Sequence, residues 1–145
     1  MKPKIIIGSD HAGFQMKQAL RDWLIAREYV VEDFGVQSDS PADYPDIAHP
    51  VADRISEDNA YIGILLCGSG NGVAITANKH PDIRAAICWT DELASLARLH
   101  NDANILCIPA RFVTLEDAMS MAERFLNTAF EGGRHQRRVN KMRCI

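Results

Sequence analysis

The sequence contains no long hydrophobic run. Of its 145 residues 47% are hydrophobic, yet no apolar stretch approaches the roughly 20 residues that a membrane-spanning helix needs. We expect no signal peptide, because the first residues lead straight into a short apolar strand. These absences exclude a membrane-spanning protein and predict a cytoplasmic one.

Paired cysteine motifs are also absent. The sequence has no C-x-x-C pair and no cluster of cysteine and histidine at zinc-binding spacing; its four cysteines are Cys67, Cys88, Cys107 and Cys144. This argues against a disulfide framework and against a structural metal site, so we expect reduced thiols. The sequence also lacks linkers and internal repeats, and we predict one domain over residues 1–145.

The charge is unevenly distributed. The chain carries a net charge of −3, but residues 131–145 contain five Arg or Lys residues and one Glu. This C-terminal tail therefore carries +4 and the remaining chain −7. A basic tail on an acidic body favours docking onto an anionic ligand or a neighbouring subunit over a general nucleic-acid surface.

Short apolar runs alternate with helical patterns, which is typical of repeated βαβ units. Strands are predicted at residues 4–8, 29–34, 62–66, 85–88 and 105–108, and helices at 14–27, 45–58, 72–79, 91–99 and 115–130. Thr90 and Thr114 are candidate N-caps, and the polar positions of the first helix should face water. Because the strand runs do not alternate with polar residues, we predict a five-stranded parallel sheet covered on both faces.

Residues 61–72 read YIGILLCGSGNG, an apolar run that stops at Cys67 and continues as three glycines interleaved with Ser69 and Asn71. This pattern places Cys67 at the carboxyl end of a buried strand, where a helix follows. Backbone amides without an obstructing Cβ can surround an anion there, and the same field favours the thiolate, the reactive form of cysteine.

Open parallel sheets bind ligands where the strand order reverses, commonly between strands one and three. The loops after these strands contain Asp10, His11 and Cys67, so topology predicts that a carboxylate, an imidazole and a thiol meet. His100 closes a helix and Arg111 follows the fifth strand; we expect both to face the same crevice.

Several known motifs fail on spacing. The loop G-x-G-x-G lacks the final spacing of the dinucleotide fingerprint and the Gly-Lys-Ser/Thr ending of a P-loop. Ser69 has no flanking glycines two positions away, so the G-x-S-x-G hydrolase signature is absent. A cysteine phosphatase loop would carry an arginine where this chain has Val73. In the tail, Arg134 and Arg138 would align on one helix face, an arrangement that suits phosphate.

Taken together, the segments GSDHAGFQMK, DYPD, CGSGNG, ANK, RLHND.N and EGGRHQRRV closely resemble the ribose-5-phosphate isomerase B family, which includes the galactose-6-phosphate isomerase subunits. The resemblance implies a Rossmann-like α/β fold and an aldose–ketose isomerase of sugar phosphates that needs no cofactor and no metal. It also implies a homodimer, or a dimer of dimers, whose active sites draw on two chains.

The same resemblance assigns roles to individual residues. Cys67 is the base that moves a proton between C2 and C1, with the Ser69 hydroxyl hydrogen-bonded beside it, and His100 opens the sugar ring. The loop amides hold the enediolate oxygen; they belong to Gly68, Ser69, Gly70, Asn71 and Gly72. Hydroxyl groups and the ring oxygen are held by Asp10, His11, Tyr44 and Asn101, and the phosphate by Arg111, Arg134 and Arg138. A subgroup of the family uses a glutamate where this chain has Val73, so the cysteine subtype is expected.

Simpler roles stay open for several of these residues. Asp10 could cap a helix, Asn101 could be a helix C-cap, His100 could complement the helix C-terminus, and Tyr44 could only pack. The arginines could be surface charges or form subunit salt bridges.

Other functions also stay open. A noncatalytic phosphate or nucleotide sensor could use the same loop, and a nucleic-acid-binding module could use the basic tail. Among substrates, the sequence does not separate ribose 5-phosphate from allose 6-phosphate or galactose 6-phosphate.

Overall fold

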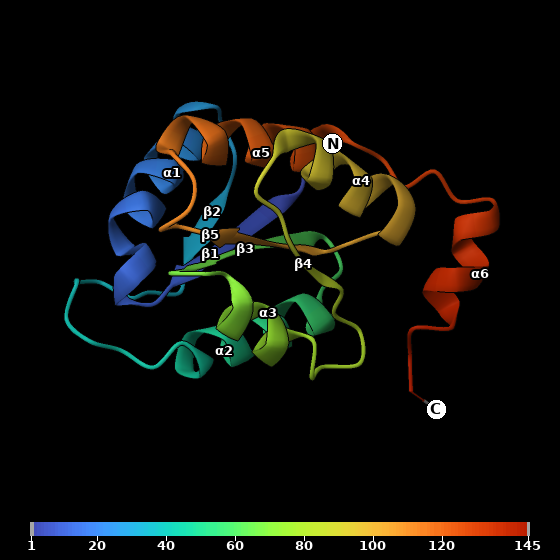
Figure 1. The fold of residues 1–145 in the computed structure, drawn as a ribbon, viewed down its shortest axis with the longest axis horizontal. Helices are drawn as coiled ribbons and strands as arrows, with labels where there is room; N and C mark the ends of the chain where they lie inside the picture. Colours follow the sequence, from blue (N-terminus) through green and yellow to red (C-terminus); the bar gives the residue numbers. More distant parts are fainter. Residues whose placement is uncertain (1, 145) are drawn as a thin grey trace.

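Parallel strands form the centre of the structure, a computed structural model that describes residues 2–144. Within these residues one five-stranded sheet has the order β2-β1-β3-β5-β4 (Figure 1). Its strands are β1 (Lys4–Ser9), β2 (Val31–Asp33), β3 (Tyr61–Cys67), β4 (Ala85–Ile87) and β5 (Ile105–Pro109). All neighbouring strands pair in parallel, as predicted.

Helices cover both faces of this sheet. The helices α1 (Phe14–Ala26), α4 (Asp91–Asn101) and α5 (Leu115–Asn127) lie on one face, and α2 (Pro45–Glu57) and α3 (Asn71–Ala77) lie on the other (Figure 1). A 3-10 turn, η1 (His11–Gly13), precedes α1. The last helix, α6 (Arg134–Asn140), contacts α4 and stands apart from the layers. The predicted three-layer, Rossmann-like α/β fold is confirmed.

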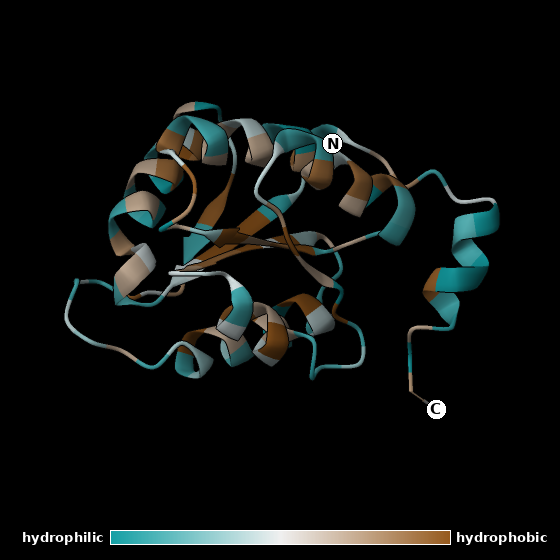
Figure 2. Cartoon of the chain, in the orientation of Figure 1, coloured by the Kyte–Doolittle hydropathy of each residue, from teal (hydrophilic) through white to brown (hydrophobic). Residues whose placement is uncertain are grey.

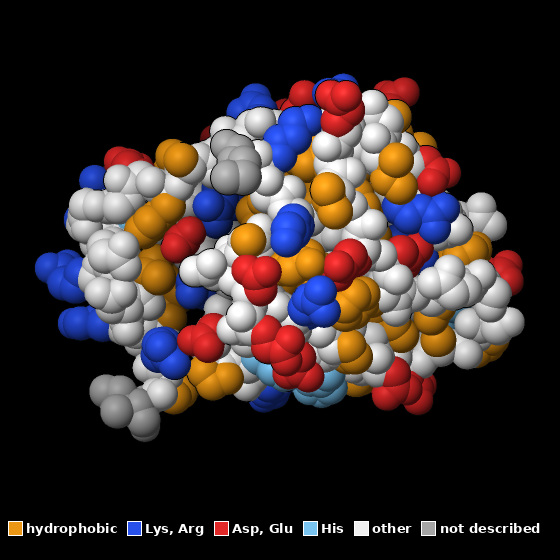
Figure 3. Space-filling model, turned by 180° about the vertical axis from the view of Figure 1, so that it is seen from behind, with side chains coloured by type: hydrophobic (Ala, Val, Ile, Leu, Met, Phe, Trp, Pro, Cys, Tyr) orange, Lys and Arg blue, Asp and Glu red, His pale blue; other side chains and the backbone are white. Residues whose placement is uncertain are grey.

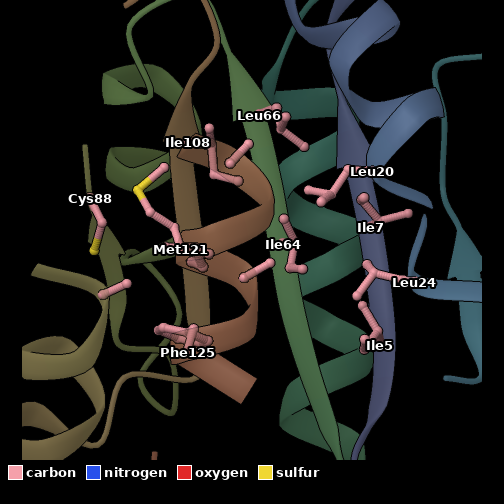
Figure 4. Packing of buried hydrophobic residues seen from close by; sticks show 14 of the residues in the cluster. Ile5, Ile7, Leu20, Leu24, Ile64, Leu66, Cys88, Ile108, Met121 and Phe125 are labelled. Carbon is pink, nitrogen blue, oxygen red and sulfur yellow. The ribbon is translucent and has the colours of Figure 1, made fainter. Parts of the chain in front are cut away.

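The core explains why the strand sequences do not alternate. Successive residues of β1 serve opposite layers: Ile5 and Ile7 pack toward α1 and α5, whereas Ile6 packs toward α2, and all three are fully buried. Figure 4 shows the first of these layers, in which Ile5, Ile7 and Ile64 meet side chains such as Leu24. A strand covered on both faces must be apolar at every position, and the strands accordingly form a hydrophobic band between the helices in Figure 2.

The two threonine N-caps are confirmed. The Thr90 hydroxyl accepts the amide of Leu93 at 3.2 Å at the start of α4. Thr114 and Asp117 form a reciprocal capping box at the start of α5. Both helices begin at the carboxyl edge of the sheet, so the caps fix the edge at which the loops converge.

Some predicted boundaries are wrong by a few residues. The strand predicted at residues 29–34 is limited to β2, because the chain turns at Glu28 with φ of 69° and pairs with β1 only from Val31. The helix predicted to end at residue 130 ends at Asn127, where Thr128 turns extended. The helix predicted to end at residue 99 continues to Asn101, and its C-cap is Asp102 in the left-handed region.

Lys17 corrects the prediction that every polar position of the first helix faces water. Its side chain is fully buried, and Nζ donates to both carboxylate oxygens of Asp33 at 2.9 Å and to the Val36 carbonyl at 2.7 Å. Burial alone would raise the pKa of Asp33, but hydrogen bonds from Lys17 and the Gly35 amide lower the pKa below its usual value. Arg21 adds a second ion pair to the same carboxylate at 2.9 Å. This network ties α1 to the segment that leaves β2.

Across the described residues 2–144, no helix combines the length and the apolar composition needed to cross a bilayer.

Candidate active site

A cleft opens at the carboxyl ends of β1 and β3. Neighbouring strands β1 and β3 lead outward to β2 and β5, so the cleft lies where the strand order reverses, as topology predicts. Its volume is about 600 Å³, within the usual range for small-molecule sites. The cleft is lined by Asp10, His11, Ala12, Tyr44, Cys67, Gly68, Ser69, Gly72, Arg111 and Phe112.

Cys67 is the last residue of β3 and forms part of the cleft wall. Its side chain is mostly buried, with 5% of the residue exposed. The loop after β5 is held against it: the Cys67 carbonyl accepts the Ala110 amide at 2.9 Å, and the Gly68 carbonyl accepts the Arg111 amide at 3.0 Å. These bonds place the Arg111 side chain beside the thiol loop. Cys67 and Arg111, distant in sequence, therefore share one cleft.

The glycines allow side chains to approach the loop backbone. A Cβ on Gly72 would lie 2.5 Å from Cε1 of Tyr44, so only glycine admits the tyrosine ring here. A Cβ on Gly68 would lie 3.2 Å from Nη1 of Arg111, and Gly70 adopts φ of 76°. A side chain at any of these three positions would therefore meet a different obstacle: a neighbouring side chain at two of them and an unfavourable backbone angle at the third. A tight turn alone would not need all of them.

Ser69 differs from its predicted contact. Its Oγ accepts the Asn71 amide at 3.2 Å, at the point where α3 begins. Among the described residues, the structure has no hydrogen bond between this hydroxyl and Cys67, so that expected bond is absent. The hydroxyl oxygen instead makes the local bond that is usual for a serine two residues before a helical amide.

Asp10 and His11 combine structural and cleft positions. The Asp10 Oδ1 accepts the amides of Ala12 at 3.0 Å and Gly13 at 3.2 Å, which confirms that this residue caps η1 while it also lines the cleft. His11 Nδ1 accepts the Ala42 amide at 3.1 Å. A neutral His11 ring therefore carries its proton on Nε2, which stays available as a donor.

The remaining predicted site residues lie elsewhere. Helix α4 begins after β4 at the carboxyl edge and runs back across the sheet, so His100 and Asn101 in its last turn lie toward the amino edge. The Glu131 amide donates to the Leu99 carbonyl at 3.0 Å, which brings the tail to the same place. The expectation that His100 and Arg111 face one crevice is therefore wrong within a single chain.

The tail does form the predicted helix, with Arg134 and Arg138 one turn apart in α6. Both are exposed, and neither forms an ion pair within residues 2–144. Beside them, His100 stacks on His135, with ring centroids 4.3 Å apart and an angle of 14° between the planes. We call this region, comprising the last turn of α4 and residues 131–140, the α6 end.

Sequence reasoning missed three residues at these two places. Phe112 lines the cleft and is 75% exposed, and no motif singled it out. Glu131 and His135 lie within the segment EGGRHQRRV, but no spacing rule predicted that they meet His100.

The other three cysteines lie outside the cleft. Burial raises the pKa of Cys88 to about 12 and raises that of Cys107 well above its usual value. Cys88 and Cys107 are almost completely buried, and Cys144 is exposed in the tail. Among the four cysteines, Cys67 alone lies on the wall of this cleft, next to the glycine-rich loop.

A parallel α/β sheet with a thiol and an amide-rich loop at its reversal point defines a Rossmann-like protein with a small-molecule site of the enzyme type. The Ribose/Galactose Isomerase family matches residues 5–142, and the chain belongs to this family. The family predicted from the sequence motifs is confirmed.

Individual relatives agree over nearly the whole chain. Ribose-5-phosphate isomerase B of Escherichia coli is 41% identical over 142 residues, which cover 98% of this chain and 95% of that protein. The crystal structure of a ribose 5-phosphate isomerase from Thermotoga maritima has a TM-score of 0.95 and 45% identity, covering 97% of both chains. The Mycoplasma genitalium enzyme, solved with bound ribulose-5-phosphate, has a TM-score of 0.92 and 41% identity, covering 96% of this chain and 93% of that one.

Proposed function

We propose that this protein is an aldose–ketose isomerase that interconverts ribose 5-phosphate and ribulose 5-phosphate. The observation that carries this proposal is the position of Cys67 on the wall of the cleft beside its glycine loop. Relatives named ribose-5-phosphate isomerase B, one of them solved with bound ribulose-5-phosphate, support the choice of substrate. We expect the protein to work in the cytoplasm, where its four free cysteines stay reduced.

The chemistry follows from the groups around the cleft. The Cys67 thiolate takes the proton from C2 of the open-chain aldose, which leaves a cis-enediolate with its negative charge on O1. The thiol then returns the proton to C1, and the proton of the O2 hydroxyl passes to O1, so that C2 becomes the carbonyl carbon. The loop amides from Gly68 to Gly72 hold the negative oxygen of that intermediate, for which the Asn71 amide must exchange its bond to Ser69. Val73, fully buried at the start of α3, has no group that could take the proton, which leaves the task to the thiol.

The other residues bind and prepare the sugar. Asp10, His11 and Tyr44 contact hydroxyl groups from one side of the cleft, and Arg111 contacts the phosphate. His100 opens the ring, Asn101 contacts the ring oxygen, and Arg134 and Arg138 complete the phosphate site. Remote phosphate binding positions the reacting carbons over the thiol.

This assignment requires a second chain, so we propose a homodimer, or a dimer of dimers, with shared active sites. Arg134 and Arg138 of the α6 end then reach the cleft of the partner. The surface supports such a partner: Ile75 and Trp89 are 61% and 58% exposed near the edge strand β4. Basic side chains gather where α6 stands off from the body (Figure 3), as expected for a segment that docks elsewhere.

Turnover on three sugar phosphates tests the function. We expect the purified protein to convert ribose 5-phosphate faster than allose 6-phosphate or galactose 6-phosphate. Cys67→Ala should lower turnover by about 10³-fold, the middle of the range for a lost general base, while ribulose 5-phosphate still binds. Cys88→Ala is the matched control and should keep its activity. A Cys67→Ala protein that isomerises at full rate would refute the base assignment, and binding without turnover in the parent protein would favour a sensor.

Subunit mixing tests the shared site. In a dimer of Cys67→Ala and His100→Ala chains, one site receives both substitutions and the other receives none. If the residues come from different chains, an equal mixture of the two inactive variants should regain about a quarter of the parent activity, because half the dimers are mixed and half their sites are intact. If both residues come from one chain, mixing restores nothing.

A further inference from the structure

At the α6 end, two histidine side chains approach the same carboxylate oxygen of Glu131. His100 Nε2 lies 3.8 Å from Glu131 Oε2, and His135 Nε2 lies 3.7 Å from the same oxygen. The two imidazole rings stack almost in parallel. His135 is 5% exposed, and its buried Nε2 has no hydrogen-bond partner within the described residues. A buried imidazole nitrogen without a partner calls for an explanation.

A metal ion is one explanation, since both imidazoles and the carboxylate offer ligand atoms within 4.8 Å of one another. The ring geometry opposes it. An imidazole binds a metal through a lone pair in the plane of its ring. Because the planes of His100 and His135 are stacked and only 14° from parallel, one ion cannot lie in both planes.

The backbone holds this trio in place. Glu131 is tied to the end of α4 through its amide, which donates to Leu99. Gly132 and Gly133, both with positive φ, then turn the chain so that His135, in the first turn of α6, lies against His100. The His135 amide closes this turn by donating to the Gly132 carbonyl at 3.1 Å. The stack is thus built by the turn and does not depend on a flexible side chain.

We propose that Glu131 and His135 are positioning residues for His100: the carboxylate keeps the His100 proton on Nε2, and the stacked, uncharged His135 ring fixes the plane of the His100 ring. This inference rests on the proposed function, in which His100 opens the sugar ring. With its proton on Nε2, His100 presents the Nδ1 lone pair as the base.

Ring opening then needs one proton, which moves from the sugar to Nδ1 and back to the sugar. Nδ1 takes the proton of the C1 hydroxyl, the bond between C1 and the ring oxygen breaks, and its electron pair leaves with the ring oxygen. The ring oxygen takes the proton back from Nδ1. While His100 is charged, Glu131 stabilises the imidazolium.

The charges around the stack direct the proton to His100. Burial lowers the pKa of His135, and the positive charges of His100, Arg134 and Arg138 act in the same direction, whereas Glu131 opposes them. His135 therefore stays neutral at a pH at which an ordinary histidine begins to charge. Two charged rings in a stack would also repel each other, so a neutral His135 leaves His100 free to take up the proton of the ring-opening step.

Two readouts on the full-length protein test this proposal. The first is the ¹⁵N chemical shift of His100, which reports the tautomer; we expect the proton on Nε2 in the parent and a mixture of tautomers in Glu131→Ala. Glu131→Gln, which keeps a side-chain oxygen at this position, should restore the parent tautomer. The second is the split between kcat and KM. In Glu131→Ala kcat should fall by about tenfold with little change in KM, because the imidazolium that forms during ring opening loses its neighbouring carboxylate.

His135 variants separate positioning from a purely structural role. His135→Phe keeps a flat ring in the stack and should retain most activity, whereas His135→Ala should lose about tenfold in kcat with little change in KM. Glu123→Ala, which removes a carboxylate on α5 that pairs only with the exposed Arg27, is the control and should alter neither readout.

The outcomes distinguish the proposals. Full activity in His100→Ala would overturn the ring-opening role in the proposed function. An inactive His100→Ala together with a parent-like tautomer and a parent-like kcat in Glu131→Ala would overturn only the inference on Glu131 and His135. Zn²⁺ binding that both Glu131→Ala and His135→Phe abolish would make the trio a metal site and would also overturn it.

Discussion

The cleft and the α6 end differ in what each contributes. Among residues 2–144, the cleft has the thiol, the loop amides and one arginine, but no imidazole paired with a carboxylate. The α6 end has two stacked imidazoles, a carboxylate and two aligned arginines, but no thiol and no glycine-rich loop after a buried strand. Each lacks what the other supplies. A parallel sheet separates them because loops and returning helices end at opposite edges.

They also differ in how they are held. Backbone hydrogen bonds join the cleft loops to one another: Ser9 to Gly35 at 2.7 Å, Asp10 to Leu66 at 3.3 Å, and Ala110 to Cys67 at 2.9 Å. The α6 end is joined to the body through α4 and the turn at Glu131. Substitutions around the cleft should therefore affect stability as well as chemistry, whereas those on α6 should affect phosphate binding or ring opening with little loss of stability.

Outside the cleft, the largest effect is expected from the α6 arginines. Arg134→Ala together with Arg138→Ala should raise KM for ribose 5-phosphate by about 10²-fold or more, because each charged hydrogen bond to phosphate contributes about 1.5–3 kcal/mol. Steady-state kinetics measure this change, and thermal unfolding should stay close to the parent. Arg137→Ala, on the same short helix, is the matched control. An equal rise in KM for Arg137→Ala would indicate a general positive field in place of a phosphate clamp.

A large effect on stability is expected from Lys17. Lys17→Met should lower the free energy of unfolding by about 3 kcal/mol, since it leaves the half-buried Asp33 with one partner fewer. Urea denaturation measures the change. Arg21→Met, which removes the more exposed partner of the same carboxylate, is the control and should cost less than about 1 kcal/mol. Equal losses would contradict the importance of burial.

The same ion pair should make stability depend on acid. The pKa of Asp33 in the folded protein lies below its usual value of 3.8, so its ionised form stabilises the fold above that pH. This contribution is lost as the pH falls through the folded-state pKa. The parent should therefore lose more stability than Lys17→Met between neutral pH and pH 3. Parallel acid titrations of the two proteins check the sign.

Most of the fold could be predicted from the sequence, because strands that are buried on both faces appear as uninterrupted apolar runs. Ile5, Ile6 and Ile7 read as one apolar run, and such a run fits only a covered parallel strand. Lys17 could not be predicted, because helical spacing shows which positions face inward but not that a lysine finds Asp33 there. The predicted start of β2 was wrong for a related reason, because pairing with β1, and not local composition, decides where this strand begins.

The site could be predicted in part. Asp10, His11, Cys67 and Arg111 follow from topology and motif, and the structure brings all four to one cleft. His100 followed from family resemblance alone, and no local pattern states at which edge of the sheet a helix ends. The stack with His135 depends on a turn at Gly132 and Gly133, whose direction is a property of the folded chain.

A smaller effect is expected at Gly72. Gly72→Ala places a methyl group 2.5 Å from the Tyr44 ring, so the ring must move out of the cleft wall. We expect kcat/KM to fall by about tenfold, as for a displaced substrate-positioning group, with a modest loss of thermal stability. In a Tyr44→Ala background the same substitution meets no ring and should have little further effect. A full additional loss in that background would mean that the loop backbone itself was distorted.

The smallest effect is expected at Cys88, which contrasts with the cleft thiol. Because burial raises the pKa of Cys88 to about 12, only about one molecule in 10⁴ carries its thiolate at pH 8, and the thiolate is the form that reacts. Iodoacetamide at pH 8 should therefore leave Cys88 and the buried Cys107 unmodified in the folded protein. In a Cys144→Ala background, alkylation should occur at Cys67, abolish turnover and be slowed by ribose 5-phosphate. Mass spectrometry of the digested protein identifies the modified residue, and modification of Cys88 at the rate of Cys67 would show that the cleft does not distinguish its thiol.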